Sequence, residues 1–189
     1  MSTWFISDLH LAPQETRITA GFLDFMLEPQ AGDALYILGD FFNYWIGDDV
    51  QDPYIEQIQQ VLKATAERGV QIYFMHGNRD FLLGETFCQQ AGMTLLDDPT
   101  LIELGGEPAL LMHGDSLCTQ DLAYMEFRKM ARNPEWQAQF LGQPIEDRIA
   151  YAQKARAESQ SSNSMKDDAI MDVTPSEVDR ELINANCFR

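Results

Sequence analysis

Four short apolar runs in this sequence each end in polar side chains of the kind that bind metal ions. The runs lie at residues 4–6, 34–38, 72–75 and 109–112, and the polar residues after them include Asp8 and His10, Asp40, Asn78 and His113. Apolar runs of this length are typical of buried strands. Strands that share a sheet can bring such ends to one edge, so the pattern predicts a metal site at that edge.

Helical periodicity between these runs indicates the fold class. In residues 54–68, Ile55, Ile58 and Leu62 repeat at i, i+3 and i+7, which predicts an amphipathic helix. The predicted order is strand 3–7, helix 18–26, strand 34–38, helix 54–68 and strand 71–75. This alternation predicts an α/β fold in which helices cover a parallel sheet.

The second half of the sequence has a different pattern. Short strands are predicted at residues 93–96, 101–104 and 109–112, and helices at residues 122–130, 136–141 and 145–157. The pair Gly105-Gly106 predicts a hairpin turn. Residues 158–164 are polar and predict a loop. Thr174, followed by Pro175 and Glu177, predicts a helix start with Thr174 as N-cap and Glu177 completing a capping box.

Composition and charge exclude several classes of protein. The chain has 189 residues, 45% of them hydrophobic, which favours one globular domain. A formal net charge of −17 argues against general affinity for nucleic acid or for anionic membrane surfaces, since both need clustered Lys and Arg. Three widely spaced cysteines favour a reducing, cytoplasmic setting. No apolar run approaches the roughly 18 residues of a membrane span.

The residue types at the strand ends suit one kind of chemistry. Asp8 and His10 occupy alternate positions, so an extended backbone would point both side chains to the same side. The complete set offers oxygen and imidazole ligands, which suit manganese or a related divalent ion. Two ions bridged by a carboxylate activate water and stabilise a phosphoryl group, and Arg79 would donate to phosphate oxygens.

Other polar and aromatic residues have structural interpretations. His76 precedes the loop glycine and is expected to satisfy a backbone group rather than to bind metal. The remaining structural interpretations are a solvated turn for Asp48 and Asp49, helix caps for Asp115 and Asp121, and core packing for Trp4, Trp45 and Trp136.

The ordered set of motifs resembles that of a known family. Asp8-Leu9-His10, Gly39-Asp40, Gly77-Asn78-Arg79-Asp80 and His113-Gly114-Asp115 are similar to the motifs of the calcineurin-like metallophosphoesterases. Residues 36–40, 45–49, 76–84, 112–115 and 169–173 resemble, more closely, the UDP-2,3-diacylglucosamine hydrolases of lipid A biosynthesis. The resemblance implies a two-sheet sandwich flanked by helices, in a single domain over 1–189 with a helical lid insertion at 119–166.

The resemblance also implies an activity and a metal site. It implies a manganese-dependent diphosphatase that cleaves the pyrophosphate bond of UDP-2,3-diacylglucosamine to UMP and 2,3-diacylglucosamine 1-phosphate. By motif, two Mn²⁺ ions would be bound by Asp8, His10, Asp40, Asn78 and His113, with Asp40 as the bridge. Asn78 and Arg79 would be catalytic, and Arg79 would stabilise the charge of the transition state.

Substrate and membrane contacts follow from the same resemblance. The substrate-binding residues would be Asn78, Arg79, Asp121, Ser159, Asn163 and Lys166. The lid would enclose the acyl chains. Residues 128–156 hold six bases and three acids, which is compatible with approach to a membrane surface. The expected location is therefore the cytoplasm, peripherally at the inner membrane.

One departure from the family pattern concerns the C-terminus. The family's metal site ends in a Gly-His-Thr-His motif, whereas the three histidines here are His10, His76 and His113. The chain is therefore expected to be a C-terminally truncated version with reduced activity. Two alternatives are a metallophosphoesterase acting on another phosphoester and a non-catalytic lipid-binding remnant.

Overall fold

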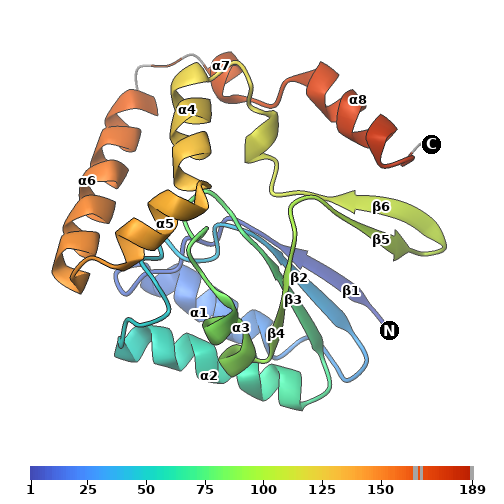
Figure 1. The fold of residues 1–189 in the computed structure, drawn as a ribbon. Coiled ribbons are helices and arrows are strands. Elements are labelled where there is room, and N and C mark those ends of the chain that lie inside the picture. The colour runs from blue at the N-terminus through green and yellow to red at the C-terminus, as the bar shows by residue number, and fades with distance from the viewer. Residues whose placement is uncertain (164–165, 167, 188–189) are drawn as a thin grey trace. The chain divides into compact units, whose positions relative to one another are not determined.

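The computed structural model of the chain describes residues 1–163, 166 and 168–187, without the side chains of 162, 163, 168 and 169 (Figure 1). The chain divides into two compact units, Met1–Asp98 and Pro99–Arg189. The single domain over 1–189 with a lid at 119–166 stays a prediction.

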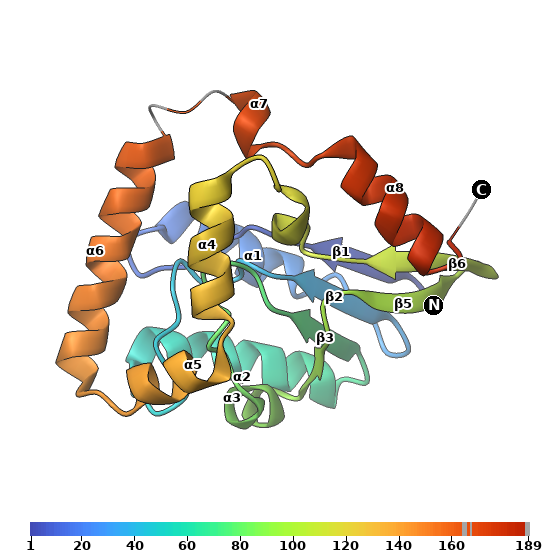
Figure 2. The ribbon, with the colours of Figure 1, turned by 45° about the horizontal axis from the view of Figure 1, so that its top comes forward.

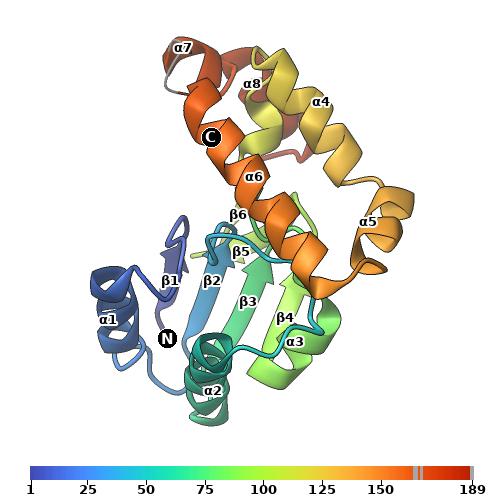
Figure 3. The same cartoon turned by 90° about the vertical axis from the view of Figure 1, so that its left-hand side faces the viewer.

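The first unit is built on a parallel four-stranded sheet. Strands β1 (Thr3–Ile6), β2 (Ala34–Leu38), β3 (Gln71–Met75) and β4 (Met93–Leu96) pair in that order (Figure 3). The connecting helices are α1 (Thr16–Phe25), α2 (Pro53–Glu67) and α3 (Glu85–Ala91). The alternation expected from the sequence is confirmed, and β2 and β3 begin and end at the predicted residues.

Side chains of β1 alternate between the two faces of this sheet. Trp4 packs edge-on against Phe25 of α1, with 5.6 Å between ring centroids. The next residue, Phe5, points to the opposite face, because successive strand residues alternate in direction. There it stacks on Tyr36 at 5.3 Å, and Tyr36 stacks on Tyr73 at 4.7 Å. Trp4 is therefore a packing residue, as expected.

Helices α2 and α3 begin at aspartate caps of two kinds. Asp52 caps α2 locally and accepts the N–H of Tyr54 at 2.8 Å. Helix α3 is capped by the distant Asp48, which accepts the N–H groups of Gly84 at 2.9 Å and Phe87 at 3.0 Å. Residues 48 and 49 form the expected turn and Asp49 is exposed, but Asp48 is half-buried and caps a helix, so the solvated interpretation is wrong for Asp48. Because this cap comes from another loop, the local sequence did not predict α3.

The second unit contains a hairpin and a series of helices. Strands β5 (Thr100–Leu104) and β6 (Glu107–Leu111) are antiparallel. Gly105 and Gly106 between them have φ values of +64° and +89°, as a tight hairpin turn requires. The helical elements are η1 (Asp115–Leu117), α4 (Leu122–Ala131), α5 (Pro134–Leu141), α6 (Ile145–Asn163), α7 (Asp168–Met171) and α8 (Pro175–Asn184) (Figure 2). The described residues form two sheets, one of four strands and one of two, and the α/β class is confirmed.

Helix α6 is longer than the sequence predicted. The loop at 158–164 is wrong for residues 158–163, which continue α6, and residue 164 lies outside the described residues. Glu158 lies 3.8 Å from Lys154, one turn earlier. A polar segment is excluded from a core but not from an exposed helix, so polarity alone misled the prediction. Neither α6 nor any other helix in the described part of the chain has the length and apolar character that crossing a bilayer requires.

Helix α8 begins where the sequence predicted, but its cap differs. Thr174 is the N-cap and Pro175 opens the helix. The predicted capping box is wrong, because the Thr174 side chain makes no bond to α8. Its hydroxyl instead pairs with that of Thr119 at 2.9 Å, and Glu177 pairs with Arg180. The threonine pair joins α8 to the segment before α4.

Candidate metal centre

Three of the predicted metal ligands lie together at the end of the parallel sheet. Asp8, His10 and Asp40 each place one ligand atom within 4.8 Å of the others. The Nε2 atom of His10 lies 3.7 Å from Oδ1 of Asp8 and 3.4 Å from Oδ2 of Asp40. Asp40 is buried and Asp8 is exposed. The cluster therefore combines a buried carboxylate with one that solvent reaches.

These three residues share an uncommon backbone conformation. Their φ values are +56° for Asp8 and +51° for both His10 and Asp40, in the left-handed region that a Cβ disfavours. Strand β1 ends at Ile6, so the extended backbone expected at Asp8 and His10 is wrong. The N–H groups of Asp8 and His10 donate to the carbonyls of Gly39 at 3.1 Å and Asp40 at 2.9 Å. Backbone strain held by its surroundings is concentrated at functional sites.

Gly77 allows the loop after β3 to approach Asp40. A Cβ on Gly77 would lie 2.2 Å from both the backbone nitrogen and Oδ1 of Asp40. Two residues later, the N–H of Arg79 donates to Oδ1 of Asp40 at 2.9 Å. Asn78 stands between these two contacts, so its backbone is held beside Asp40.

The guanidinium group of Arg79 lies among the clustered side chains. Its Nε is 3.3 Å from Oδ2 of Asp40, and another of its nitrogens contacts Nδ1 of His10. It also donates to Oδ1 of Asn43 at 3.2 Å. Asn43 was not among the predicted site residues, because no motif in the sequence marks an acceptor whose partner is 36 residues away.

Asp80 is a buried carboxylate that links the loop after β2 to the loop after β3. It is 0% exposed and accepts the N–H groups of Gly77 at 2.9 Å, Asp40 at 3.2 Å, Phe41 at 2.7 Å and Phe42 at 3.3 Å. Burial, with the nearby charge of Asp40, raises the pKa of Asp80 to about 6, although the backbone hydrogen bonds oppose the rise. The sequence showed Asp80 only as part of a motif. The apolar residues that follow it were the one signal of its burial.

His76 is structural, as expected. Its Nε2 atom pairs with the carbonyl of Leu83 at 2.6 Å, and its ring packs edge-on against Phe74 at 5.7 Å. The ring therefore satisfies a backbone group in the loop after β3.

In the second unit, His113 follows β6 and precedes a buried carboxylate. Asp115 opens η1, where it accepts from Tyr124 and Arg128 rather than capping a helix. The cap expected at Asp115 is therefore wrong, whereas Asp121 does cap α4 by accepting the N–H of Tyr124 at 3.1 Å. Whether His113 joins the Asp8, His10 and Asp40 cluster stays a prediction.

Two predicted substrate residues of the second unit are in contact. The Nζ atom of Lys166 donates to Oδ2 of Asp121 at 2.6 Å. Burial alone would raise the pKa of Asp121, but the hydrogen bond and charge of Lys166 hold it below its usual value. Ser159 is half-buried on α6, and Asn163 ends that helix with its side chain outside the described residues.

The donor set of the cluster fits a divalent cation. Carboxylate oxygens of Asp8 and Asp40 and an imidazole nitrogen of His10 suit manganese and related ions, whose ligands are oxygen and nitrogen rather than sulfur. The absence of a Cβ at Gly77 lets the loop after β3 lie directly against Asp40. The geometry defines a candidate metal centre at the carboxyl ends of parallel strands.

Comparison with known families agrees with this geometry. Residues 1–175 match the family model described as calcineurin-like phosphoesterase. The chain therefore belongs to the calcineurin-like phosphoesterase family, whose members use divalent metal ions.

Curated relatives narrow the resemblance to one kind of hydrolase, named UDP-2,3-diacylglucosamine hydrolase. The relative from Chromohalobacter salexigens is 54% identical, over 95% of this chain and 73% of the relative. Those from Cellvibrio japonicus and Marinobacter nauticus are 53% and 52% identical, over 98% and 96% of this chain and 78% and 75% of the relatives. A solved structure from Aquifex aeolicus aligns with a TM-score of 0.42 and 18% identity, over 85% of this chain and 75% of that one. The family model and the three hydrolase relatives confirm the family resemblance expected from the motifs.

Proposed function

We propose that the chain is a UDP-2,3-diacylglucosamine diphosphatase, which hydrolyses the pyrophosphate bond to give UMP and 2,3-diacylglucosamine 1-phosphate. The observation that carries the proposal is the cluster of Asp8, His10 and Asp40 beside the Arg79 guanidinium. The names of relatives at 54%, 53% and 52% identity support the choice of substrate.

Two Mn²⁺ ions are part of the proposal. Their ligands would be Asp8, His10, Asp40, Asn78 and His113, with Asp40 shared between the ions. When bound, such ions act as Lewis acids toward phosphoryl oxygens and lower the pKa of bound water. The place of Asn78 is supported by its backbone neighbours, since both Gly77 and Arg79 contact Asp40.

Arg79 is the side chain to which we assign charge stabilisation. Asp40 and Asn43 hold its guanidinium at 3.3 Å and 3.2 Å, and 21% of the side chain is exposed. A planar guanidinium offers several donors in a fork that matches phosphate oxygens. A donor already held in place needs little reorganisation as negative charge develops in the transition state.

Removing the Asn43 amide is expected to lower turnover by acting through Arg79. Asn43→Ala loses one hydrogen bond to a charged group, which corresponds to roughly a tenfold fall in kcat. Asn43→Asp keeps the acceptor and should retain most of the activity. Arg79→Ala alone should lower kcat by about 10²- to 10³-fold. Adding Asn43→Ala to Arg79→Ala should change kcat little. Rates of UMP release by the wild type, the two alanine variants and the double variant measure this coupling. If Asn43→Ala lowered kcat equally in the wild type and in Arg79→Ala, the result would contradict an effect of Asn43 through Arg79.

The substrate residues of the second unit complete the proposal. We assign substrate contacts to Asn78, Arg79, Asp121, Ser159, Asn163 and Lys166. The ion pair of Lys166 with Asp121 supports a shared polar site, because it fixes a donor-rich cation beside the start of α4.

Association with the cytoplasmic face of the inner membrane is also proposed. The helices of the second unit expose large apolar side chains, namely Leu122 (74%), Met130 (38%), Leu141 (38%), Ile145 (37%) and Tyr151 (39%). Residues 128–156 of the same helices hold six bases and three acids; of the bases, Lys129 and Lys154 are exposed, whereas Arg148 is buried and Arg128 pairs with Asp115. Basic side chains attract anionic headgroups, and apolar side chains partition into the interface, so the two features together favour a lipid surface.

Manganese-dependent release of UMP from UDP-2,3-diacylglucosamine tests the function. Asp40→Asn is expected to lower the rate by more than about 100-fold, beyond the loss typical of an outer-shell partner. Asp24→Asn, on the exposed side of α1, should leave the rate unchanged. Turnover restricted to a simple diester such as bis(p-nitrophenyl) phosphate would reassign the substrate. Lipid binding without turnover of either compound would contradict the enzyme assignment.

A further inference from the structure

Residues 43–49, which lie between β2 and α2, contact Arg79 at both its side chain and its backbone. Oδ1 of Asn43 accepts from the guanidinium at 3.2 Å. The backbone N–H of Trp45 donates to the carbonyl of Arg79 at 3.0 Å. The position of this segment, the 43–49 loop, therefore helps to determine where the guanidinium lies.

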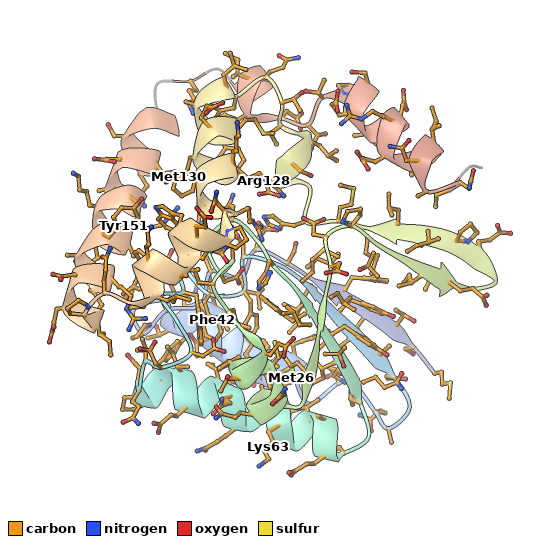
Figure 4. All side chains as sticks on the ribbon, in the orientation of Figure 1. Met26, Phe42, Lys63, Arg128, Met130 and Tyr151 are labelled. Atoms are coloured by element: carbon orange, nitrogen blue, oxygen red, sulfur yellow. The ribbon has the colours of Figure 1, made fainter. Side chains whose placement is uncertain are left out.

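Trp45 anchors the 43–49 loop in the interior of the first unit. It is 5% exposed, and its ring centroid lies 4.8 Å from that of Phe42, which Figure 4 labels, and 4.7 Å from that of Phe87 in α3. Its indole Nε1–H donates to Oδ1 of Asp48 at 2.9 Å. A hydrogen bond to a carboxylate is directional, so it fixes the orientation of a ring that apolar packing alone holds less tightly.

Asp48 joins this indole to the first turn of α3. Oδ1 of Asp48 also accepts the N–H of Gly84 at 2.9 Å, and Oδ2 accepts the N–H of Phe87 at 3.0 Å. A Cβ on Gly84 would lie 2.7 Å from Oδ2, so the carboxylate lies directly against the backbone at the start of the helix. The bond to Trp45 therefore comes from a carboxylate that the helix itself holds in place.

We propose that Asp48 is a positioning residue for Arg79: it fixes the indole of Trp45, whose backbone N–H holds the carbonyl of Arg79. The inference rests on the proposed function, in which Arg79 stabilises the charge of the transition state. Such stabilisation depends on a donor that is already in place, and a displacement of about 1 Å at a reacting centre can cost about 100-fold in rate. Asp48 acts only through Trp45 and the 43–49 loop.

The Nε–H signal of Arg79 in ¹H–¹⁵N NMR tests this support without metal or substrate. The signal that Arg79→Ala removes belongs to this residue. In the wild type, Nε lies 3.3 Å from Oδ2 of Asp40, so its hydrogen should exchange slowly with water. Trp45→Phe removes the bond to Asp48 and leaves the α3 cap in place. It is expected to speed this exchange about tenfold, the usual effect of losing one hydrogen bond to a charged group.

Rates of UMP release give a second measurement. Asp48→Ala and Trp45→Phe are each expected to lower kcat about tenfold with little change in KM, because Arg79 acts in the transition state. The two changes break the same bond, so together they should lower kcat no further than Asp48→Ala does. In Arg79→Ala, neither change should lower kcat further.

Two other variants separate positioning from stability. Gly92→Ala weakens the opposite end of α3, because Gly92 has a φ of +71° and a Cβ there would lie 2.7 Å from the Cβ of Ala66. It should unfold at lower urea concentration than the wild type but keep the wild-type kcat and Arg79 signal. Asp48→Asn retains an oxygen that can accept from the indole, so it should recover most of the kcat that Asp48→Ala loses.

The outcomes separate this inference from the function on which it rests. An Arg79 signal and a kcat that Trp45→Phe leaves unchanged overturn the inference, as does a loss of kcat from Trp45→Phe that persists in Arg79→Ala. If Asp48→Ala does not fold, Trp45→Phe still gives both readings. A wild-type protein that releases no UMP, but whose Arg79 signal responds to Trp45→Phe, overturns the proposed function, and the support of Arg79 by Asp48 stands.

Discussion

Replacing Gly77 with alanine is expected to cost about 3 kcal/mol or more of stability and to lower turnover about 100-fold. The new Cβ would lie 2.2 Å from the backbone nitrogen and from Oδ1 of Asp40. Neither atom is free to move, because the nitrogen donates to Asp80 at 3.2 Å and Oδ1 accepts from Arg79 at 2.9 Å. One of the two loops must therefore shift, and Asp40 moves away from His10.

Urea unfolding and UMP release measure both effects, and Gly21 of α1 provides a matched control. A Cβ on Gly21 meets nothing within 4 Å. Gly21→Ala is therefore expected to be neutral or to stabilise the protein by up to about 1 kcal/mol, since alanine is the better helix former. If Gly77→Ala unfolds and turns over as Gly21→Ala does, the contact between Gly77 and Asp40 is wrong.

The parts of the fold that were predictable are those fixed by local sequence. Strands β2 and β3 are apolar runs that end at a turn, and both match the predicted residues. Helix α2 carries its own cap at Asp52. Helix α3 depends on Asp48, 36 residues before Gly84, and no local pattern contains that information. The sequence did not predict that α6 continues past residue 157. The polar residues there indicate exposure to solvent, but an exposed segment can be either a helix or a loop.

The candidate site divides in a similar way. Residue types at strand ends were enough to indicate Asp8, His10 and Asp40 as neighbours. The backbone that brings them together was not predictable, because left-handed residues are stabilised by hydrogen bonds between loops that meet only after folding. Asn43 and Asp80 went unassigned for the same reason. Their partners are a guanidinium and four backbone N–H groups supplied by other segments.

Replacing Asp80 with alanine is expected to cost roughly 4 kcal/mol. The substitution leaves four N–H donors without an acceptor, on Asp40, Phe41, Phe42 and Gly77. Each buried donor left unsatisfied costs about 1–3 kcal/mol. An opposing gain comes from removing a buried charge, since burial raises the pKa of Asp80 to about 6 and so costs roughly 3 kcal/mol at neutral pH. The free-energy cost of the four unsatisfied N–H donors exceeds the gain from removing the charge, unless water takes the place of the carboxylate at each donor.

Three further aspartate variants separate this effect from the loss of a negative charge. Asp24→Ala removes an exposed charge and should change the free energy of unfolding by less than about 0.5 kcal/mol. Asp52→Ala removes the α2 cap and should cost about 1 kcal/mol. Asp80→Asn removes the charge but keeps one acceptor oxygen, so its cost should fall between those of Asp52→Ala and Asp80→Ala. Urea unfolding without added metal ranks the four. An Asp80→Ala protein as stable as Asp24→Ala would show that the loops of Asp40 and Gly77 hold together without the buried carboxylate.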